Sequence, residues 1–222
     1  TSRLGGVMYA WQFAVIPPLP SRPGNSFSNM FALLRRNWVL AGMGGTIFSY
    51  GGYHVFFTYL RPFLEHDLAL QPAALSSVLL AFGIANCLGT LAAGFVLGKW
   101  FRPTLFGVHL ALAAVAILLF YVQNRPLNMI LVMAWGFLFG FIPVSWSAWI
   151  ARTLADKAEL AGGISVAVTQ FSIGLVAAVG GLTFDDFGIS GIFLIAVTFL
   201  LAAAGLVRGS FTLYAKDREQ LP

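Results

Sequence analysis

The chain has 222 residues, of which 59% are hydrophobic and only 9% are charged, and its formal net charge is +5. Soluble domains carry about 25% charged residues, and a soluble chain this apolar would expose large adhesive patches, so the composition excludes a soluble globular protein. The basic residues are scattered singly between apolar runs and form no stripe, which argues against nucleic acid as a partner and favours a role in membrane topology.

The first 37 residues contain no complete membrane span. Residues 4–16 are apolar but too short to cross a bilayer, and the Pro- and Ser-rich loop PPLPSRPGNS follows them. This segment is either the tail of a span whose beginning is missing or a segment at the membrane interface. Because the sequence starts at Thr1 and not at Met, we expect a fragment whose N-terminal part is absent.

Six later runs lack Asp, Glu, Lys and Arg and are each about long enough to cross the hydrocarbon core, which needs about 20 apolar residues. They are approximately 38–60, 72–98, 104–122, 128–150, 160–184 and 187–207. Backbone polar groups must be satisfied internally in lipid, so these runs should be helices. The predicted fold is therefore an all-α membrane protein with a six-helix domain over residues 38–208.

The distribution of Lys and Arg predicts the orientation of the spans. The loops on one side hold ten of these residues, and the loops on the other side hold only Arg61 and Arg125. The richer side should be cytoplasmic, and it includes the loop before the first span and a tail at residues 209–222. The ten are Arg22, Arg35, Arg36, Lys99, Arg102, Arg152, Lys157, Arg208, Lys216 and Arg218.

Small residues recur at four-residue spacing in the second and fourth spans. Gly94 and Gly98 form one pair, and Gly136 and Gly140 form another. Such pairs let helices approach closely in lipid, where association depends on packing and polar contacts. We expect tight helix contacts at both pairs.

The fourth span carries a bulky aromatic face beside its small face. Pro143 removes a backbone hydrogen bond and should kink this helix. Trp146 suits a cavity wall and a lipid-facing position equally well. For Trp149, close to the end of the span, we favour a lipid-facing interface anchor.

Polar side chains inside the spans are the candidates for a binding site, because they are costly in lipid and usually face protein or water. Asn86 and Gln170 lie near the centres of their spans. Each forms either an interhelical hydrogen bond or a contact with a polar substrate at the midplane. For His109, in the third span, a structural hydrogen bond is the favoured role.

His54 lies in an aromatic-rich part of the first span, toward its outer end. An aromatic wall with one imidazole suits a planar, polar ligand through stacking and hydrogen bonding. No Asp or Glu lies within any span, although a proton-coupled carrier normally needs a titratable relay in the membrane. Either His54 helps to supply that relay, or the coupling acid lies in the missing part.

No catalytic constellation is visible in the sequence. The single cysteine, Cys87, rules out an internal disulfide, and no HExxH, GxSxG or phosphate-binding loop is present. We therefore predict that the chain is not an enzyme.

Several motifs resemble those of the major facilitator superfamily, in particular its drug:proton antiporters. FTYLRPFLE at residues 57–65 is similar to the end of the seventh helix in many of these antiporters. Residues 143–181, which contain W-S-x-W, R-T-L-A-D, A-E-x-A-G-G and V-A-V-x-Q, resemble the tenth-to-eleventh helix region of its bacterial purine nucleoside exporters. GKWFRP at residues 98–103 resembles the short loop between helices eight and nine.

The resemblance implies that the six spans are helices seven to twelve, the C-terminal half of a fold built from 3+3 inverted repeats. Residues 1–37 would be the end of helix six and the loop between the halves, and the partner would be the missing N-terminal six-helix half. The implied function is proton-coupled export by alternating access across a bacterial inner membrane. The implied substrate is a purine nucleoside or a related small polar aromatic, with no cofactor besides the coupling proton.

The resemblance also implies residue roles. The cavity would be lined by Tyr50, His54, Phe57, Asn86, Trp146 and Gln170. Arg152 and Asp156 of RTLAD, together with Arg61, would make gating contacts. A multidrug or sugar exporter of the same superfamily, or a truncated membrane protein that does not transport, remains the alternative.

Overall fold

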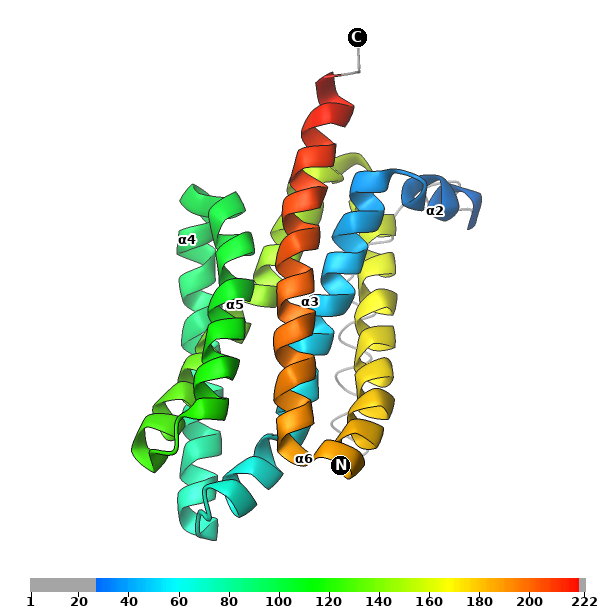
Figure 1. The fold of residues 1–222 in the computed structure, drawn as a ribbon. Helices are drawn as coiled ribbons and strands as arrows, with labels where there is room; N and C mark the ends of the chain where they lie inside the picture. Colours follow the sequence, from blue (N-terminus) through cyan, green and yellow to red (C-terminus); the bar gives the residue numbers. More distant parts are fainter. Residues whose placement is uncertain (1–26, 220–222) are drawn as a thin grey trace, which may run out of the picture.

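The computed structural model describes residues 27–219, and Figure 1 shows this part of the chain as a bundle of helices. The segment 4–16 and Arg22 lie outside the described residues. Within residues 27–219 there is no strand. The elements are α2 (Phe27–Leu34), α3 (Asn37–Pro62), the π-helical turn η1 (Phe63–Asp67), α4 (Pro72–Tyr121), α5 (Arg125–Thr153), the 3₁₀ turn η2 (Ala155–Lys157) and α6 (Ala158–Glu219).

Helices α4 and α6 each fold back on themselves. They contain 50 and 62 residues, so as straight helices they would be about 75 and about 93 Å long, against a hydrocarbon core of about 30 Å. Each contains one residue with a non-helical backbone, Trp100 (φ −124°, ψ 45°) in α4 and Gly188 (φ 59°, ψ −150°) in α6. The helices reverse direction at these two residues, as Figure 1 shows.

The described chain therefore makes six helical passes, one for each predicted span. They are α3, the first arm of α4 (72–99), its second arm (101–121), α5, the first arm of α6 (158–187) and its second arm (189–219). By length and composition, Pro72–Tyr121, Arg125–Thr153 and Ala155–Glu219 are apolar enough to cross a membrane. α3 has 26 residues and is not among these helices, because its Gly, Ser, Tyr and His residues lower its mean hydropathy.

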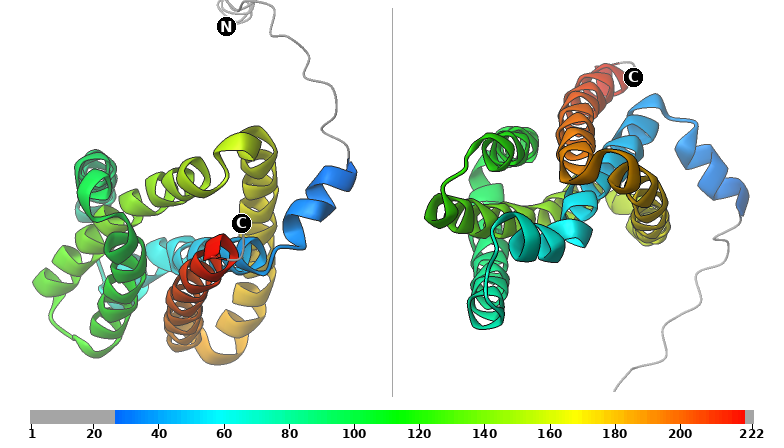
Figure 2. Two further views of the ribbon diagram at one scale, coloured as in Figure 1. Left: turned by 90° about the horizontal axis from the view of Figure 1, so that it is seen from above. Right: turned by 60° about the horizontal axis from the view of Figure 1, so that its bottom comes forward.

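The passes pack in two main groups, α3 against α6 and α4 against α5. Figure 2, which views the bundle from above, shows α3 in the interior with the arms of α6 on its flanks. The largest fully buried side chains come from all of these helices and form one core. They include Phe56 and Leu60 of α3, Leu105 and Leu112 of α4, Trp135 and Ile142 of α5, and Ile192 and Leu200 of α6.

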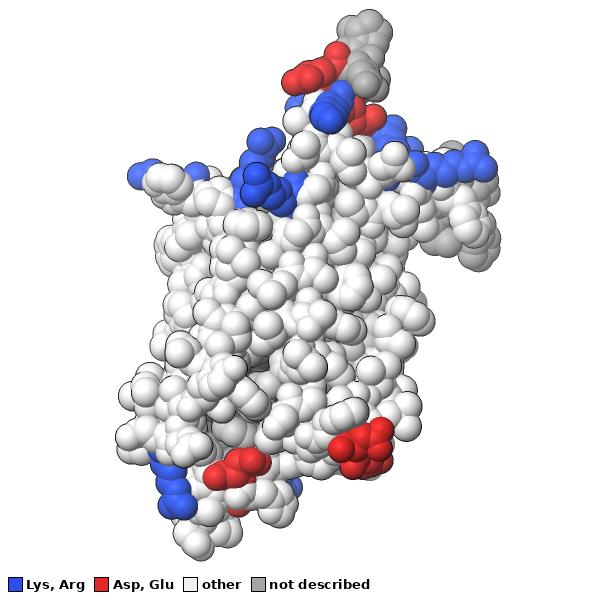
Figure 3. All heavy atoms as spheres, in the orientation of Figure 1, with Lys and Arg blue, Asp and Glu red and all other residues white. Residues whose placement is uncertain are grey.

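Charged side chains gather at the two ends of the bundle and leave a wide uncharged belt between them (Figure 3). We call the end that contains the Trp100 turn the basic end. Of the described Lys and Arg residues, only Arg61 and Arg125 lie at the opposite end, so the predicted asymmetry holds in the structure. The others are Arg35, Arg36, Lys99, Arg102, Arg152, Lys157, Arg208, Lys216 and Arg218.

Glycines on α5 bring it into backbone contact with the first arm of α4. A methyl group at Gly140 would collide with the backbone of Asn86 and Thr90, and one at Gly136 would lie 2.8 Å from the carbonyl oxygen of Phe82. The prediction of a tight contact at this pair is confirmed. The described residues provide no such contact at Gly94 and Gly98, because a methyl group at either position would meet none of their atoms within 4 Å.

The second arm of α6 does not end with the bilayer span. It continues as a helix through residues 209–219, the segment for which the sequence suggested a tail, and packs against the start of α3. Trp38 Nε1 donates to Asp217 Oδ2 at 2.9 Å, and the Ser210 hydroxyl donates to the Trp38 carbonyl oxygen at 2.9 Å. The Tyr214 ring adds an edge-on contact with Trp38. These bonds join the first and last passes at the basic end.

Candidate functional site

A cleft of about 360 Å³ lies where α3, α5 and the first arm of α6 meet. It brings together three of the six residues predicted to bind substrate, Tyr50, Trp146 and Gln170. Its wall also carries hydroxyl groups and small residues that the prediction did not include. These are Ser147 and Pro143 of α5, and Gly162, Ser165 and Thr169 of α6, with Ile150 and Val166 completing the lining.

A buried hydrogen-bond network holds Trp146 in the cleft wall. Nδ1 of His109 lies 2.7 Å from the carbonyl oxygen of Leu105, so in the neutral imidazole Nδ1 carries the proton and Nε2 is an acceptor. The Ser49 hydroxyl donates to His109 Nε2 at 2.5 Å, and Trp146 Nε1 donates to Ser49 Oγ at 3.1 Å. The carbonyl of Gly45, 2.7 Å away, shares the Ser49 proton.

This network links three passes: α3, the second arm of α4, and α5. Ser49 and His109 are fully buried and Trp146 is 2% exposed. The structural role that the sequence favoured for His109 is confirmed. The structure also decides between the cavity wall and the lipid-facing position that were considered for Trp146. Its ring is buried in protein and borders the cleft, so it does not face lipid.

Trp149, one turn along α5, is buried too. It is 2% exposed, and its ring packs against Trp38 and Trp146 at centroid distances of 5.9 and 5.7 Å. It lies directly over Gly42, where even a methyl group would collide with the indole. The prediction of a lipid-facing anchor at Trp149 is therefore wrong, because a glycine on α3 makes room for the ring inside the bundle.

His54 and Phe57 adjoin the cleft, one and two turns beyond Tyr50 toward the opposite end, and do not line it. His54 is half-buried, and its Nδ1 donates to the Tyr50 carbonyl oxygen at 2.9 Å. Its ring stacks near Tyr50 and meets Phe139 edge-on at 5.8 Å. Among the described residues its Nε2 has no hydrogen-bond partner, so this nitrogen can bind a ligand or a proton.

An aromatic wall extends from the cleft along α3 toward the opposite end. The Phe57 ring is 45% exposed and stacks against Phe82 at 5.8 Å. Tyr53, which the predicted site did not include, stacks on Phe139 and continues this wall toward α5. The signal that could have found Tyr53 is its spacing, because Tyr50, Tyr53 and Phe57 follow one another at three and four residues and so share one helical face.

Asn86 lies outside the cleft and joins two helices. Its Nδ2 donates to the Gly136 carbonyl oxygen at 3.2 Å, and Thr90, one turn further along α4, donates to the Gly140 carbonyl oxygen at 3.3 Å. Both bonds cross the glycine contact between α4 and α5. Of the two roles considered for Asn86, the structure shows the interhelical hydrogen bond. A role of Asn86 in substrate binding stays a prediction.

The three predicted gating residues lie at both ends of the bundle. Arg61, at the opposite end, pairs with Glu65 through a 2.9 Å contact on the surface. Arg152, at the basic end, donates to the Leu97 carbonyl oxygen at 2.9 Å and places its guanidinium 4.4 Å from the centre of the Phe101 ring. Asp156 is exposed in η2. Arg152 thereby fastens the end of α5 to the end of the first arm of α4.

Ser165 and Thr169 also line the cleft, although the predicted substrate-binding set did not include them. They lie four residues apart on α6, and Gly162 precedes Ser165 by three, so the three share one helical face with a polar, narrow surface. The spacing of three and four residues between Gly162, Ser165 and Thr169 is visible in the sequence and could have indicated that they share this face.

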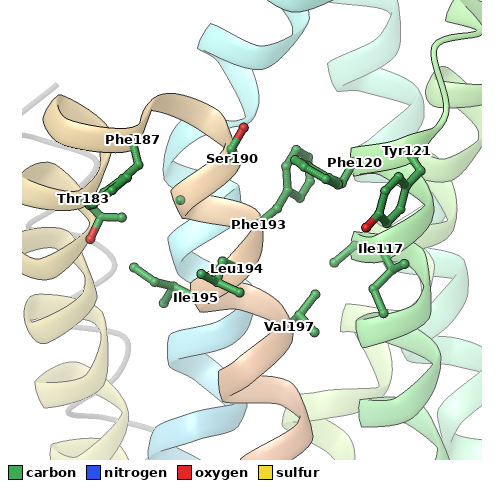
Figure 4. Close-up of a pocket in the computed structure, with 12 residues that line it drawn as sticks. Ile117, Phe120, Tyr121, Thr183, Phe187, Ser190, Phe193, Leu194, Ile195 and Val197 are labelled. Atoms are coloured by element: carbon green, nitrogen blue, oxygen red, sulfur yellow. The ribbon is translucent and has the colours of Figure 1, made fainter.

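A larger cavity, of about 540 Å³, lies elsewhere in the bundle. Figure 4 shows its side chains arranged between the second arm of α4, which supplies Ile117, Phe120 and Tyr121, and the region of α6 around the Gly188 turn. Its lining is almost entirely apolar, with only the hydroxyls of Tyr121, Thr183 and Ser190 as polar side-chain groups. None of the predicted site residues borders it.

Comparison with known proteins identifies the family. The chain matches the sequence profile of the Major Facilitator Superfamily over residues 42–221. It is 39% identical over 187 residues to the purine ribonucleoside efflux pump NepI of Salmonella paratyphi B, of Salmonella enteritidis and of Salmonella typhimurium, and each alignment covers 84% of this chain and 47% of the relative.

The chain therefore spans about half the length of the curated relatives that it matches. No solved structure matches it significantly. The profile match, the six passes and the uncharged belt agree with one another. This multi-pass membrane chain belongs to the Major Facilitator Superfamily, and its fold is that of a six-helix half of the superfamily.

Proposed function

We propose that the chain is the C-terminal half of a proton-coupled exporter that works by alternating access, with a purine nucleoside or a related small polar aromatic as substrate. The observation that carries this proposal is the cleft in which Tyr50, Trp146 and Gln170 converge. The relatives are named for purine ribonucleoside efflux, which supports the same substrate class.

The cleft has the chemistry that a nucleoside requires. The half-buried Tyr50 ring offers an apolar face for stacking on a planar base, and the buried Trp146 ring lies in the cleft wall beside it. The Gln170 amide both donates and accepts hydrogen bonds, so it can read a base edge, and the hydroxyls of Ser165 and Thr169 suit a ribose. The volume of about 360 Å³ lies within the range of about 300–1,000 Å³ that small-molecule sites occupy.

We propose that, in this half, His54 takes up and releases the coupling proton. The described passes contain no Asp or Glu between their ends, whereas His54 adjoins the cleft and has one ring nitrogen without a hydrogen-bond partner among the described residues. A carboxylate elsewhere in the whole protein is the competing assignment. An inward proton flux that survives His54→Gln would favour the carboxylate.

The excess of Lys and Arg at the basic end supports a cytoplasmic position for that end. In a bacterial inner membrane both ends of the chain would then be cytoplasmic. Arg61 would lie at the external mouth, and Arg152 and Asp156 at the internal one, where gating contacts would form and break. Cysteine labelling at positions 61 and 156 from each side of the membrane tests this orientation.

The substrate is tested with the complete gene product in a host that lacks its own nucleoside exporters. Expression should raise resistance to a toxic purine nucleoside analogue, and Gln170→Ala should lower the protective effect about 5- to 10-fold, as expected for the loss of one or two hydrogen bonds. Gln123→Ala, which changes an exposed glutamine in the loop before α5, is the matched control.

A panel of sugars and unrelated drugs separates the alternatives. Resistance to the drugs but not to the nucleoside analogue would point to a multidrug exporter. Equal resistance with Gln170→Ala and with Gln123→Ala would refute the assignment of the cleft, and no resistance to any compound would refute transport.

A further inference from the structure

A second cavity, of about 480 Å³, lies at the basic end between the Trp100 turn of α4, the end of α5 and the end of α6. Four cationic side chains line it: Lys99, Arg102, Arg152 and Arg218. No Asp or Glu of the described residues belongs to its lining. It is separate from the cleft, with which it shares no residue.

The positive charge of this cavity is not neutralised by the described protein. Across residues 27–219 the only ion pair within 4.0 Å is the one between Arg61 and Glu65 at the opposite end. Asp217, which is close in sequence to Arg218, accepts its hydrogen bond from Trp38. Four like charges around one cavity repel one another, so the site favours an anion.

Aromatic rings orient two of the guanidinium groups. Arg152 lies 4.4 Å from the centre of the Phe101 ring, and Arg102 lies 5.3 Å from that of Phe211. Arg152 uses one N–H to bind the Leu97 carbonyl oxygen, and a guanidinium has five N–H donors. The remaining donors suit the tetrahedral oxygens of a phosphate, which arginine binds in a bidentate manner.

The position of the cavity selects the source of the phosphate. The cavity lies where the uncharged belt gives way to the charged end, which is the level of lipid headgroups (Figure 3). Trp100 at its edge is 59% exposed, as in the aromatic belts of membrane interfaces, and Leu213 between its α6 residues is 37% exposed. An acyl chain can therefore lie beside a headgroup that is held in the cavity.

We propose that this cavity binds the phosphate of an anionic phospholipid through Lys99, Arg102, Arg152 and Arg218. Basic pockets between membrane helices on the cytoplasmic side bind such headgroups in general. The bound phosphate would bridge the ends of α4, α5 and α6. The proposal stands independently of the transported substrate.

The test measures how phosphatidylglycerol raises the unfolding temperature of the complete purified protein in mixed micelles, relative to phosphatidylcholine. Arg102→Gln combined with Arg218→Gln should raise the concentration of phosphatidylglycerol needed for half of the effect by about 30-fold, which corresponds to about 2 kcal/mol. Arg208→Gln combined with Lys216→Gln removes the same charge from the same end outside the cavity, and should change it less than about 3-fold.

Because each variant is compared in two lipids, a general loss of stability cancels. An equal response of the two double variants would overturn the proposal, as would equal stabilisation by phosphatidylcholine. Inorganic phosphate is the second arm: if it stabilises the protein as well as phosphatidylglycerol does at the same concentration, the ligand is a soluble phosphate and the lipid assignment is wrong.

Discussion

Replacing Ser49 by alanine should destabilise the bundle strongly, although the change removes a single oxygen atom. Ser49 is fully buried, and its hydroxyl is both the acceptor for Trp146 Nε1 and the donor to His109 Nε2. Ser49→Ala leaves both nitrogens without a partner inside the protein. Neither can turn to water, because His109 is fully buried and Trp146 nearly so.

The expected magnitude follows from these two orphaned groups. Interhelical hydrogen bonds in membrane proteins contribute only about 0.6 kcal/mol on average, and at most about 1.7. Leaving a buried polar group without a partner costs about 1–3 kcal/mol. With two groups affected, we expect Ser49→Ala to lower the free energy of unfolding by about 2–4 kcal/mol.

Ser145→Ala is the matched control, because Ser145 is equally buried on α5 and its hydroxyl has no hydrogen-bond partner among the described residues. Removing an unsatisfied hydroxyl should leave stability unchanged or slightly higher. Both variants of the complete protein are unfolded in mixed micelles with increasing denaturing detergent. If Ser49→Ala loses no more stability than Ser145→Ala, the network is not what holds these passes together.

Two further predictions concern contacts between helical passes. Gly140→Ala should destabilise the protein by about 1–3 kcal/mol, because the new methyl group collides with the backbone of α4, whereas Gly94→Ala, with open space around it, should be neutral or mildly stabilising in the same unfolding assay. Asp217→Ala should lower stability by about 1–2 kcal/mol through loss of its bond to Trp38; Glu219→Ala is the control, and equal effects would contradict this role for the bond.

The passes were predictable because charge is excluded from lipid, and the points at which they turn were less so. The last break was expected around Asp185 and Asp186, the charged pair between two apolar runs. The helix instead continues through both and reverses at Gly188. A φ of 59° with a ψ of −150° is accessible essentially to glycine alone, so backbone freedom and not charge fixes the turn.

The candidate site was predictable in part for a related reason. The cost of polar groups in lipid drew attention to Gln170, and the structure places it beside Tyr50 in one cleft. The same rule gave no weight to Ser165, because a hydroxyl in a helix can bond to its own backbone and is cheap in lipid. The prediction for Trp149 failed because its environment depends on a glycine of another helix.

The two walls of the cleft differ in how tightly they are packed: the α5 side is held by hydrogen bonds, and the α6 side has open space beside it. Substitutions on the two sides should therefore be interpreted differently. Trp146 is held by Ser49 and His109, so changes near it alter the stability of the bundle together with the cleft. On the α6 side, a methyl group at Gly162 or Gly163 would meet no described atom within 4 Å. A bulkier residue at Gly162 should therefore leave the unfolding of these six passes unchanged. If such a substitution nevertheless alters transport, the new side chain acts on the substrate or on a surface outside residues 27–219. Substitutions on the α6 side of the cleft can therefore distinguish an effect on transport from an effect on stability.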